Sequence, residues 1–204
     1  MKNTATTVIT PEVIANAMTY ETYRTLVQNK IANNQSTGDD HSEAMVGYTK
    51  MNEQRMRRLD KKVKILPETS EQLATITTPQ IWLVLTEGWC GDAAQSVPVM
   101  VKMAAENPNI ELKFLLRDEN LPIMDEFLTN GGRSIPKLII LEKETLAVAG
   151  SWGPRPDLLQ EIFLEAKKSP DFNYPEIQKV IQIWYNKNKG VATQEEIVKI
   201  VKSS

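Results

Sequence analysis

The residue best placed to do chemistry is Cys90, the only cysteine in the chain. It lies where an apolar run, residues 81 to 86, gives way to apolar residues at helical spacing. Free backbone N–H groups in the first turn of a helix stabilise negative charge. A cysteine at this position should therefore have a pKa below the value of about 8.5 that a free thiol has. We therefore predict that Cys90 is a partly exposed nucleophile at the start of a helix. The alternative is a buried cysteine that only fills space.

Two strands and one helix must hold this cysteine in position. Residues 81 to 86 (IWLVLT) are apolar with no polar alternation, which is typical of a central strand covered on both faces. A helix is predicted from about Gly91 to Glu106, with a kink at Pro98. Residues 111 to 117 predict a second strand, parallel to the first across this helical crossover.

The chain after this unit predicts a mixed sheet and further helices. We expect a helix from Asp118 to Asn130, followed by an antiparallel hairpin over residues 137 to 150. Two more helices are predicted, from about Arg155 to Lys168 and over residues 174 to 188. The last helix should begin at Thr193, in a Thr-Gln-Glu-Glu capping box.

Upstream, apolar residues at helical spacing predict helices over Thr19 to Asn33 and from Ser42 to about Lys61. We therefore divide the chain into three parts. Residues 1–61 form an N-terminal helical extension, residues 62–168 form an α/β core, and residues 169–204 form C-terminal helices that pack on the core.

Composition narrows the function classes. With 204 residues, 41% hydrophobic and 25% charged, the chain is an ordinary globular protein. A net charge of -2 gives no strong positive field for nucleic acid, and the sequence has neither a signal-like apolar segment nor a membrane-length run. We expect a cytoplasmic protein that binds neither nucleic acid nor membrane. One cysteine and one histidine, His41, exclude an internal disulfide and make a metal or other cofactor a poor expectation.

Three separated motifs resemble the thioredoxin family. Trp89-Cys90-Gly91-Asp92-Ala93 is similar to the family's active-site motif Trp-Cys-Gly-Pro-Cys, and Pro98 matches the proline that kinks its active-site helix. The segment from Gly132 to Leu138 (GRSIPKL) resembles the family's cis-proline loop. The resemblance covers roughly residues 62–168 and implies an α/β thioredoxin-like fold, with a mixed sheet flanked by helices and extra N- and C-terminal helices.

The segment from Asn52 to Lys61 is similar to one in a bacterial, single-cysteine subgroup with a Trp-Cys-Gly-Asp active site. The family resemblance also implies a cis bond before Pro136, within reach of the Cys90 sulfur, so that backbone groups can pair with a substrate strand. Cys90 would then be the catalytic residue. The implied substrate-binding residues are Trp89, Gly91, Asp92, Ser134, Ile135 and Pro136.

Two departures from the family pattern change the expected chemistry. Ala93 occupies the position of the second, resolving cysteine, and Val84 that of a buried aspartate six residues before the first. We therefore predict monothiol exchange, in which an external thiol releases the mixed disulfide. This thiol could be a low-molecular-weight cosubstrate or the cysteine of a protein partner. Asp92 suits a helix N-terminus, but its charge beside the sulfur disfavours the thiolate.

Other interpretations stay open. The chain could be a non-catalytic peptide-binding or scaffold module that uses the cis-proline groove. A glutathione-transferase-like protein would need a larger C-terminal helical domain than residues 174–201 provide. A cluster-binding monothiol glutaredoxin would carry Cys-Gly-Phe-Ser, and the charge of Asp92 would oppose an anionic cluster. Basic residues before the core either recognise a cosubstrate carboxylate or form a solvated helix face; these are Arg55, Arg57, Arg58 and Lys61.

Overall fold

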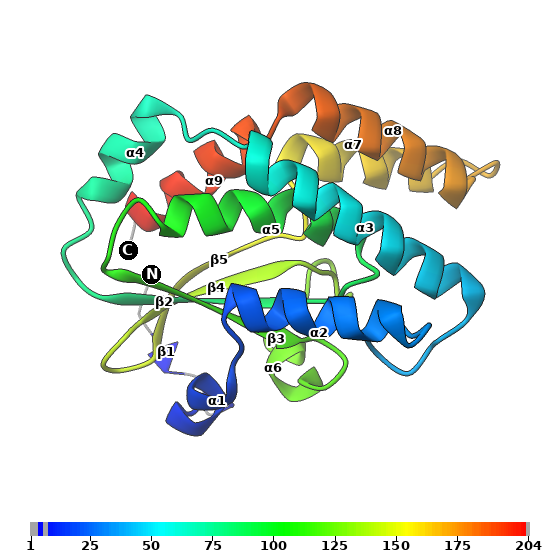
Figure 1. Ribbon diagram of the computed structural model, residues 1–204. Helices are drawn as coiled ribbons and strands as arrows, with labels where there is room; N and C mark the ends of the chain where they lie inside the picture. Colours follow the sequence, from blue (N-terminus) through cyan, green and yellow to red (C-terminus); the bar gives the residue numbers. More distant parts are fainter. Residues whose placement is uncertain (1–3, 6–7, 203–204) are drawn as a thin grey trace.

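The computed structural model describes residues 4–5 and 8–202 of the chain (Figure 1). Within this part, five strands form one mixed sheet in the order β1-β5-β4-β2-β3. The strands are β1 (Thr4–Ala5), β2 (Gln80–Thr86), β3 (Ile110–Leu116), β4 (Lys137–Glu142) and β5 (Ala147–Trp152). The helices are α1 (Pro11–Asn16), α2 (Tyr20–Ala32), α3 (Glu43–Lys62), α4 (Pro67–Ala74), α5 (Gly91–Ala104), α6 (Leu121–Asp125), α7 (Asp157–Lys167), α8 (Tyr174–Asn188) and α9 (Val191–Lys202).

Strand β2 lies between β3, its parallel neighbour, and β4, its antiparallel neighbour. All seven of its residues are buried, which explains why its apolar residues do not alternate with polar ones. The predicted central strand, crossover unit and hairpin are therefore confirmed. The helices predicted at Thr19 and Ser42 are also confirmed, since these two residues cap α2 and α3.

Helix α5 lies against the sheet and is itself covered by other helices. Figure 1 shows α3, α4, α5 and α9 on one side of the sheet and α1 and α6 on the other. Pro98 lies inside α5, as predicted, and eleven of the fourteen α5 residues are buried. The close packing of α3 on α5 brings the N-terminal helices next to the helix that starts at Cys90. The division of the chain at residues 61 and 168 stays a prediction.

Two helix predictions were wrong in their bounds. The helix expected from Asp118 to Asn130 is only α6, because the chain leaves helical geometry after Asp125 and Asn130 takes a left-handed φ of 50°. The last helix begins at Val191 rather than at Thr193. Thr193 and Gln194 are buried inside α9, and the Asn188 Oδ1 atom accepts the Ala192 N–H across 3.0 Å. The capping box is therefore not the helix start. Three elements, β1, α1 and α4, were not predicted from the sequence.

The buried apolar residues fall into two clusters. The main core lies between the sheet and its helices. The second cluster joins α7 to α8 and has Leu159, Ile177, Ile181 and Tyr185 at its centre. We refer to residues 157–188, which contain these two helices, as the C-terminal hairpin. None of the helices in the described part of the chain is long and apolar enough to cross a bilayer.

Candidate functional site

Cys90 is the N-cap residue of α5, four residues after β2 ends at Thr86. Its backbone N–H donates to the Glu87 carbonyl oxygen across 3.1 Å, closing the turn between strand and helix. The Cys90 Sγ atom accepts the backbone N–H of Ala93 across 3.4 Å. The predicted position at the first turn of a helix is therefore confirmed, and the sulfur caps that helix as a serine oxygen would.

The loop before β4 lies against this sulfur. The Ile135–Pro136 peptide bond is cis, and the Cys90 thiol donates to the Ile135 carbonyl oxygen across 3.3 Å. Ile135 and Pro136 are buried, whereas Ser134 is half-buried at the outer end of the loop. The structure thus brings the cysteine and the cis-proline loop together across 45 residues of sequence.

The thiol itself is covered: only 8% of Cys90 is exposed. Burial, followed by the negative charge of Asp92, raises the pKa of Cys90 to about 12, although the N–H groups of Asp92 and Ala93 act in the opposite direction. The expectation of a partly exposed thiol with a lowered pKa is therefore wrong for this conformation. Loss of solvent outweighs the favourable effect of the helix N-terminus.

Asp92 joins α5 to the chain that follows β5. Its Oδ2 atom accepts a hydrogen bond from Arg155 Nη2 across 2.7 Å, and its Oδ1 atom accepts one from the Tyr185 hydroxyl across 2.9 Å. Burial raises the pKa of Asp92, while Arg155 and Tyr185 oppose this rise. The carboxylate is 6% exposed as a residue and is occupied by these internal partners. These two partners could not be predicted from local sequence spacing, because they lie 63 and 93 residues away along the chain.

Helix α8 covers the start of α5. A β-carbon added at Gly91 would lie 3.2 Å from Gln182 Nε2, so the α8 side chain rests on that glycine. Gln95 Nε2 donates to the Gln182 Oε1 atom across 2.7 Å, one turn further along α5. Figure 1 shows α7 and α8 together near this end of α5. These contacts, with the bond from Tyr185 to Asp92, place α8 against the residues of α5 that directly follow the buried Cys90.

Trp89, half-buried beside the cysteine, is held by Arg117. The Arg117 guanidinium carbon lies 4.9 Å from the centre of the indole ring, in a cation–π arrangement. The same side chain donates to Asp118 Oδ1 across 2.8 Å and to the Arg133 carbonyl oxygen across 3.2 Å. Arg117 therefore ties Trp89 to the loop that carries the cis proline. Its role was not anticipated from the sequence.

Glu87 is a second buried acid near the site, three residues before Cys90. Burial raises its pKa to about 7, and its Oε1 atom accepts the Asp118 N–H across 3.0 Å. Val84 is fully buried and apolar, so it provides no proton acceptor. Glu87 was not among the site residues predicted from the sequence.

Of the four basic residues considered on α3, Arg55 lies nearest to the cysteine turn. Its Nη1 atom would lie 3.7 Å from a β-carbon at Gly91 and donates to Asn52 Oδ1 across 2.8 Å. Arg58 donates to Asn186 of α8 across 2.9 Å. Arg57 and Lys61 are exposed. Recognition of a cosubstrate carboxylate by this group stays a prediction.

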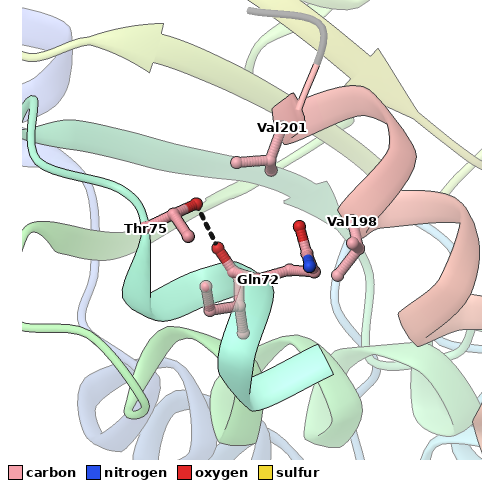
Figure 2. Close-up of a pocket in the computed structure, with 5 residues that line it drawn as sticks. Gln72, Thr75, Val198 and Val201 are labelled. Atoms are coloured by element: carbon pink, nitrogen blue, oxygen red, sulfur yellow. Dashed lines mark hydrogen bonds between the residues drawn. The ribbon is translucent and has the colours of Figure 1, made fainter. Parts of the chain in front are cut away.

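A small hollow lies between α4 and α9 (Figure 2), lined by Gln72, Leu73, Thr75, Val198 and Val201. It encloses about 20 Å³, which is room for little more than a water molecule. Asn107, which follows α5, donates to the Leu73 carbonyl oxygen, so this hollow is at the far end of α5 from Cys90. Over residues 4–5 and 8–202, no group of three or more His, Cys, Asp or Glu residues could hold a metal ion.

Known proteins resemble this chain in sequence and in fold. A family model described as thioredoxin matches residues 38–169, which is more than half of the chain and includes Cys90 and the cis-proline loop. No curated protein matches the sequence.

Two solved structures share the fold. An HIV epitope scaffold is 16% identical, with a TM-score of 0.60, and the match covers 95% of this chain and 97% of the scaffold. A Pseudomonas aeruginosa protein of unknown function is 15% identical, also with a TM-score of 0.60, over 93% of this chain and 94% of its own. At these identities the likeness extends to the fold alone. The predicted α/β thioredoxin-like fold with additional helices is thus confirmed.

Proposed function

Because the chain belongs to the thioredoxin family, we propose that it carries out thiol–disulfide exchange through Cys90 alone. The observation that carries this proposal is the position of the Cys90 sulfur, which caps α5 and lies 3.3 Å from the Ile135 carbonyl oxygen of the cis-proline loop. A substrate sulfur that approaches Cys90 would meet the backbone of this loop, which can align an extended chain by hydrogen bonding.

The exchange takes place in two balanced steps. The Cys90 thiol loses its proton to solvent, and the thiolate attacks one sulfur of a disulfide R–S–S–R′. A bond forms between Cys90 and R–S, the disulfide bond breaks, and R′–S⁻ leaves. An external thiolate R″–S⁻ then attacks the R sulfur of the mixed disulfide, which releases R–S–S–R″ and restores the Cys90 thiolate. No net oxidation of the protein results.

The second step must be external because Ala93 stands where a resolving cysteine would be. Its backbone N–H reaches the Cys90 sulfur, but its methyl side chain cannot attack a disulfide. We propose a low-molecular-weight thiol as cosubstrate and protein or small-molecule disulfides as substrates. A reducing cytoplasm would keep Cys90 in its free form. Membership of the bacterial single-cysteine subgroup with a Trp-Cys-Gly-Asp site belongs to the same proposal.

Incubation with glutathione disulfide tests the exchange directly. We expect intact-mass measurement to show one glutathione bound to the protein, and excess reduced thiol to remove it. Cys90→Ser is the matched control, since it replaces the sulfur by an oxygen of similar size and should carry no adduct. Absence of an adduct after prolonged incubation, with the protein folded throughout, would contradict monothiol exchange.

A second candidate function is a non-catalytic binding module, which the burial of Cys90 favours. A thiol that is 8% exposed, with a pKa raised to about 12, is almost entirely protonated at neutral pH in this conformation. The two functions differ in their need for sulfur. A binding module would hold its peptide partner equally well after Cys90→Ser, whereas an exchange protein would lose its mixed disulfide.

A further inference from the structure

We propose that the C-terminal hairpin, residues 157–188, is a gate that opens as a unit, and that Cys90 reacts only while the gate is open. The gate would regulate the thiol–disulfide exchange proposed above, and its biological role rests on that proposed function. The gating itself concerns the accessibility of one sulfur, which can be measured without any exchange partner.

The hairpin has an apolar cluster of its own. Leu159 of α7 packs with Ile177, Ile181 and Tyr185 of α8, and this cluster is separate from the main core. Phe163 and Phe172 add an edge-to-face ring contact with 6.2 Å between centroids. The two helices can therefore stay together while they leave the rest of the protein, because separation does not split the main hydrophobic core.

The contacts that close the hairpin over the site are polar. Four hydrogen bonds join it, or the residues just before it, to α3 and α5: Arg155 to Asp92, Tyr185 to Asp92, Gln95 to Gln182, and Arg58 to Asn186. Water can replace such bonds when the surfaces separate, so each contributes little net free energy to closure. A polar interface of this kind is typical of surfaces that part reversibly.

The closed interface also leaves buried polar atoms without partners. Among the described residues, Arg155 Nε and Nη1 and Gln182 Nε2 are buried and make no hydrogen bond. Leaving buried donors unpaired opposes closure, because each loses its bonds to water. Opening of the hairpin would return these donors to solvent.

Both ends of the mobile unit are anchored next to residues in left-handed backbone geometry. Gly153 has a φ of +114° and Gly190 a φ of +82°. Outside them, Trp152 donates to Glu196 of α9 across 2.7 Å, and Gln194 of α9 accepts the Leu66 N–H across 2.9 Å. Strand β5 and α9 thus stay on the core. Glu196 also accepts the Asp157 N–H across 2.9 Å, so the first residue of the hairpin is held at the anchor and the hinge positions lie at the two ends of the hairpin.

The test is the rate at which iodoacetamide alkylates Cys90, the only cysteine in the chain. Arg155→Met and Tyr185→Phe each leave the buried Asp92 carboxylate short of one partner in the closed state, which costs more free energy than the bond itself contributes. Both variants should therefore raise the open population and the alkylation rate by about tenfold or more. Lys168→Met is the matched control, because it removes the cation of an exposed ion pair on the same hairpin. Its rate should stay within about twofold of the wild type.

Electrostatics and gating predict opposite signs for Arg155→Met. The Arg155 charge lowers the pKa of Cys90, so its removal from a permanently closed site would slow alkylation. A slower or unchanged rate in this variant would therefore overturn the gate. Tyr185→Phe changes no charge and retains the ring, so it tests the gate with little risk to folding.

If Cys90 were alkylated only through global unfolding, the alkylation rates of the variants would instead follow their stabilities. Ile76→Val removes one methyl group from the main core. Ile76 lies beside Asn107, at the other end of α5 from Cys90, and the substitution should increase the unfolded population about fivefold. If Cys90 reacts through the gate, this variant alkylates at the wild-type rate; a rate increase that matches its loss of stability would overturn the proposal. Accelerated alkylation in the Asp92-partner variants without any glutathione adduct would overturn the proposed exchange and leave the gate in place.

Discussion

Gly153 lies directly against Pro136. A β-carbon built at position 153 would collide with the Pro136 carbonyl oxygen, and the φ of +114° at this glycine is one that other residues rarely adopt. The pairing of Leu138 with Trp152 brings the two segments together at this end of the β4–β5 hairpin. The Lys137 ammonium adds a hydrogen bond to the Gly153 carbonyl oxygen across 3.0 Å. The cis-proline loop therefore depends on the absence of a side chain at position 153.

We expect Gly153→Ala to lower the free energy of unfolding by about 2 kcal/mol or more, through both the steric clash and the unfavourable φ. The control is Gly47→Ala in α3, where a β-carbon would meet nothing within 4 Å. The free energy of unfolding of this control should rise by about 0.5–1 kcal/mol, because alanine has a higher helix propensity than glycine. Urea denaturation measures both values. Equal stability of Gly153→Ala and the wild type would show that the loop can move away from position 153.

A resolving thiol placed at position 93 should create the activity that the natural chain lacks. The wild type should not reduce insulin disulfides in the presence of thioredoxin reductase, whereas Ala93→Cys should form a reversible disulfide with Cys90 and turn over. Ala94→Cys is the control, since the next residue points about 100° further around the helix. Turnover by the wild type would require a resolving group other than residue 93.

The charge of Asp92 should be measurable at the sulfur. Asp92→Asn removes the second-largest cause of the raised pKa of Cys90, so thiolate ultraviolet absorbance should appear at lower pH than in the wild type. Asp125→Asn, which alters an exposed aspartate paired with Arg133, should leave the thiolate titration unchanged. Identical titrations of the wild type and Asp92→Asn would mean that burial alone keeps the thiol protonated.

Sequence patterns identified the part of the site that local structure determines. The unbroken apolar run before Cys90 and the helical spacing after it placed the cysteine correctly, because strand burial and helix starts leave local signatures. The packing of the C-terminal hairpin beside Cys90 left no such local signature. It depends on Tyr185 and Arg155 reaching Asp92 across long stretches of chain, and side chains that meet only through tertiary packing cannot be paired by spacing. The wrong pKa direction for Cys90 follows from this missed packing.

Glu87 should make stability fall as pH rises through the weakly acidic range. Its pKa is raised from 4.5 to about 7 in the folded protein, so the folded state binds the proton more tightly than the unfolded chain. The stabilising effect is complete below about pH 4.5 and is lost as pH rises to about 7, with a total of about 3 kcal/mol. Urea unfolding of Glu87→Gln across this range should show a flatter pH dependence. Parallel curves for the two proteins would exclude Glu87 as the source.

The burial of the Cys90 sulfur also bears on oxidative damage. Peroxide converts an accessible thiolate to sulfenic acid and then, irreversibly, to sulfinic and sulfonic acids. Many thiols escape this sequence by forming a disulfide with a neighbouring cysteine, and this chain has no second cysteine to supply one. Burial and the raised pKa of Cys90 both oppose the attack of its thiolate on peroxide, so we expect slow oxidation of this sulfur. In this chain, burial of the sulfur takes the place of the protection that a second cysteine provides in proteins that form a disulfide.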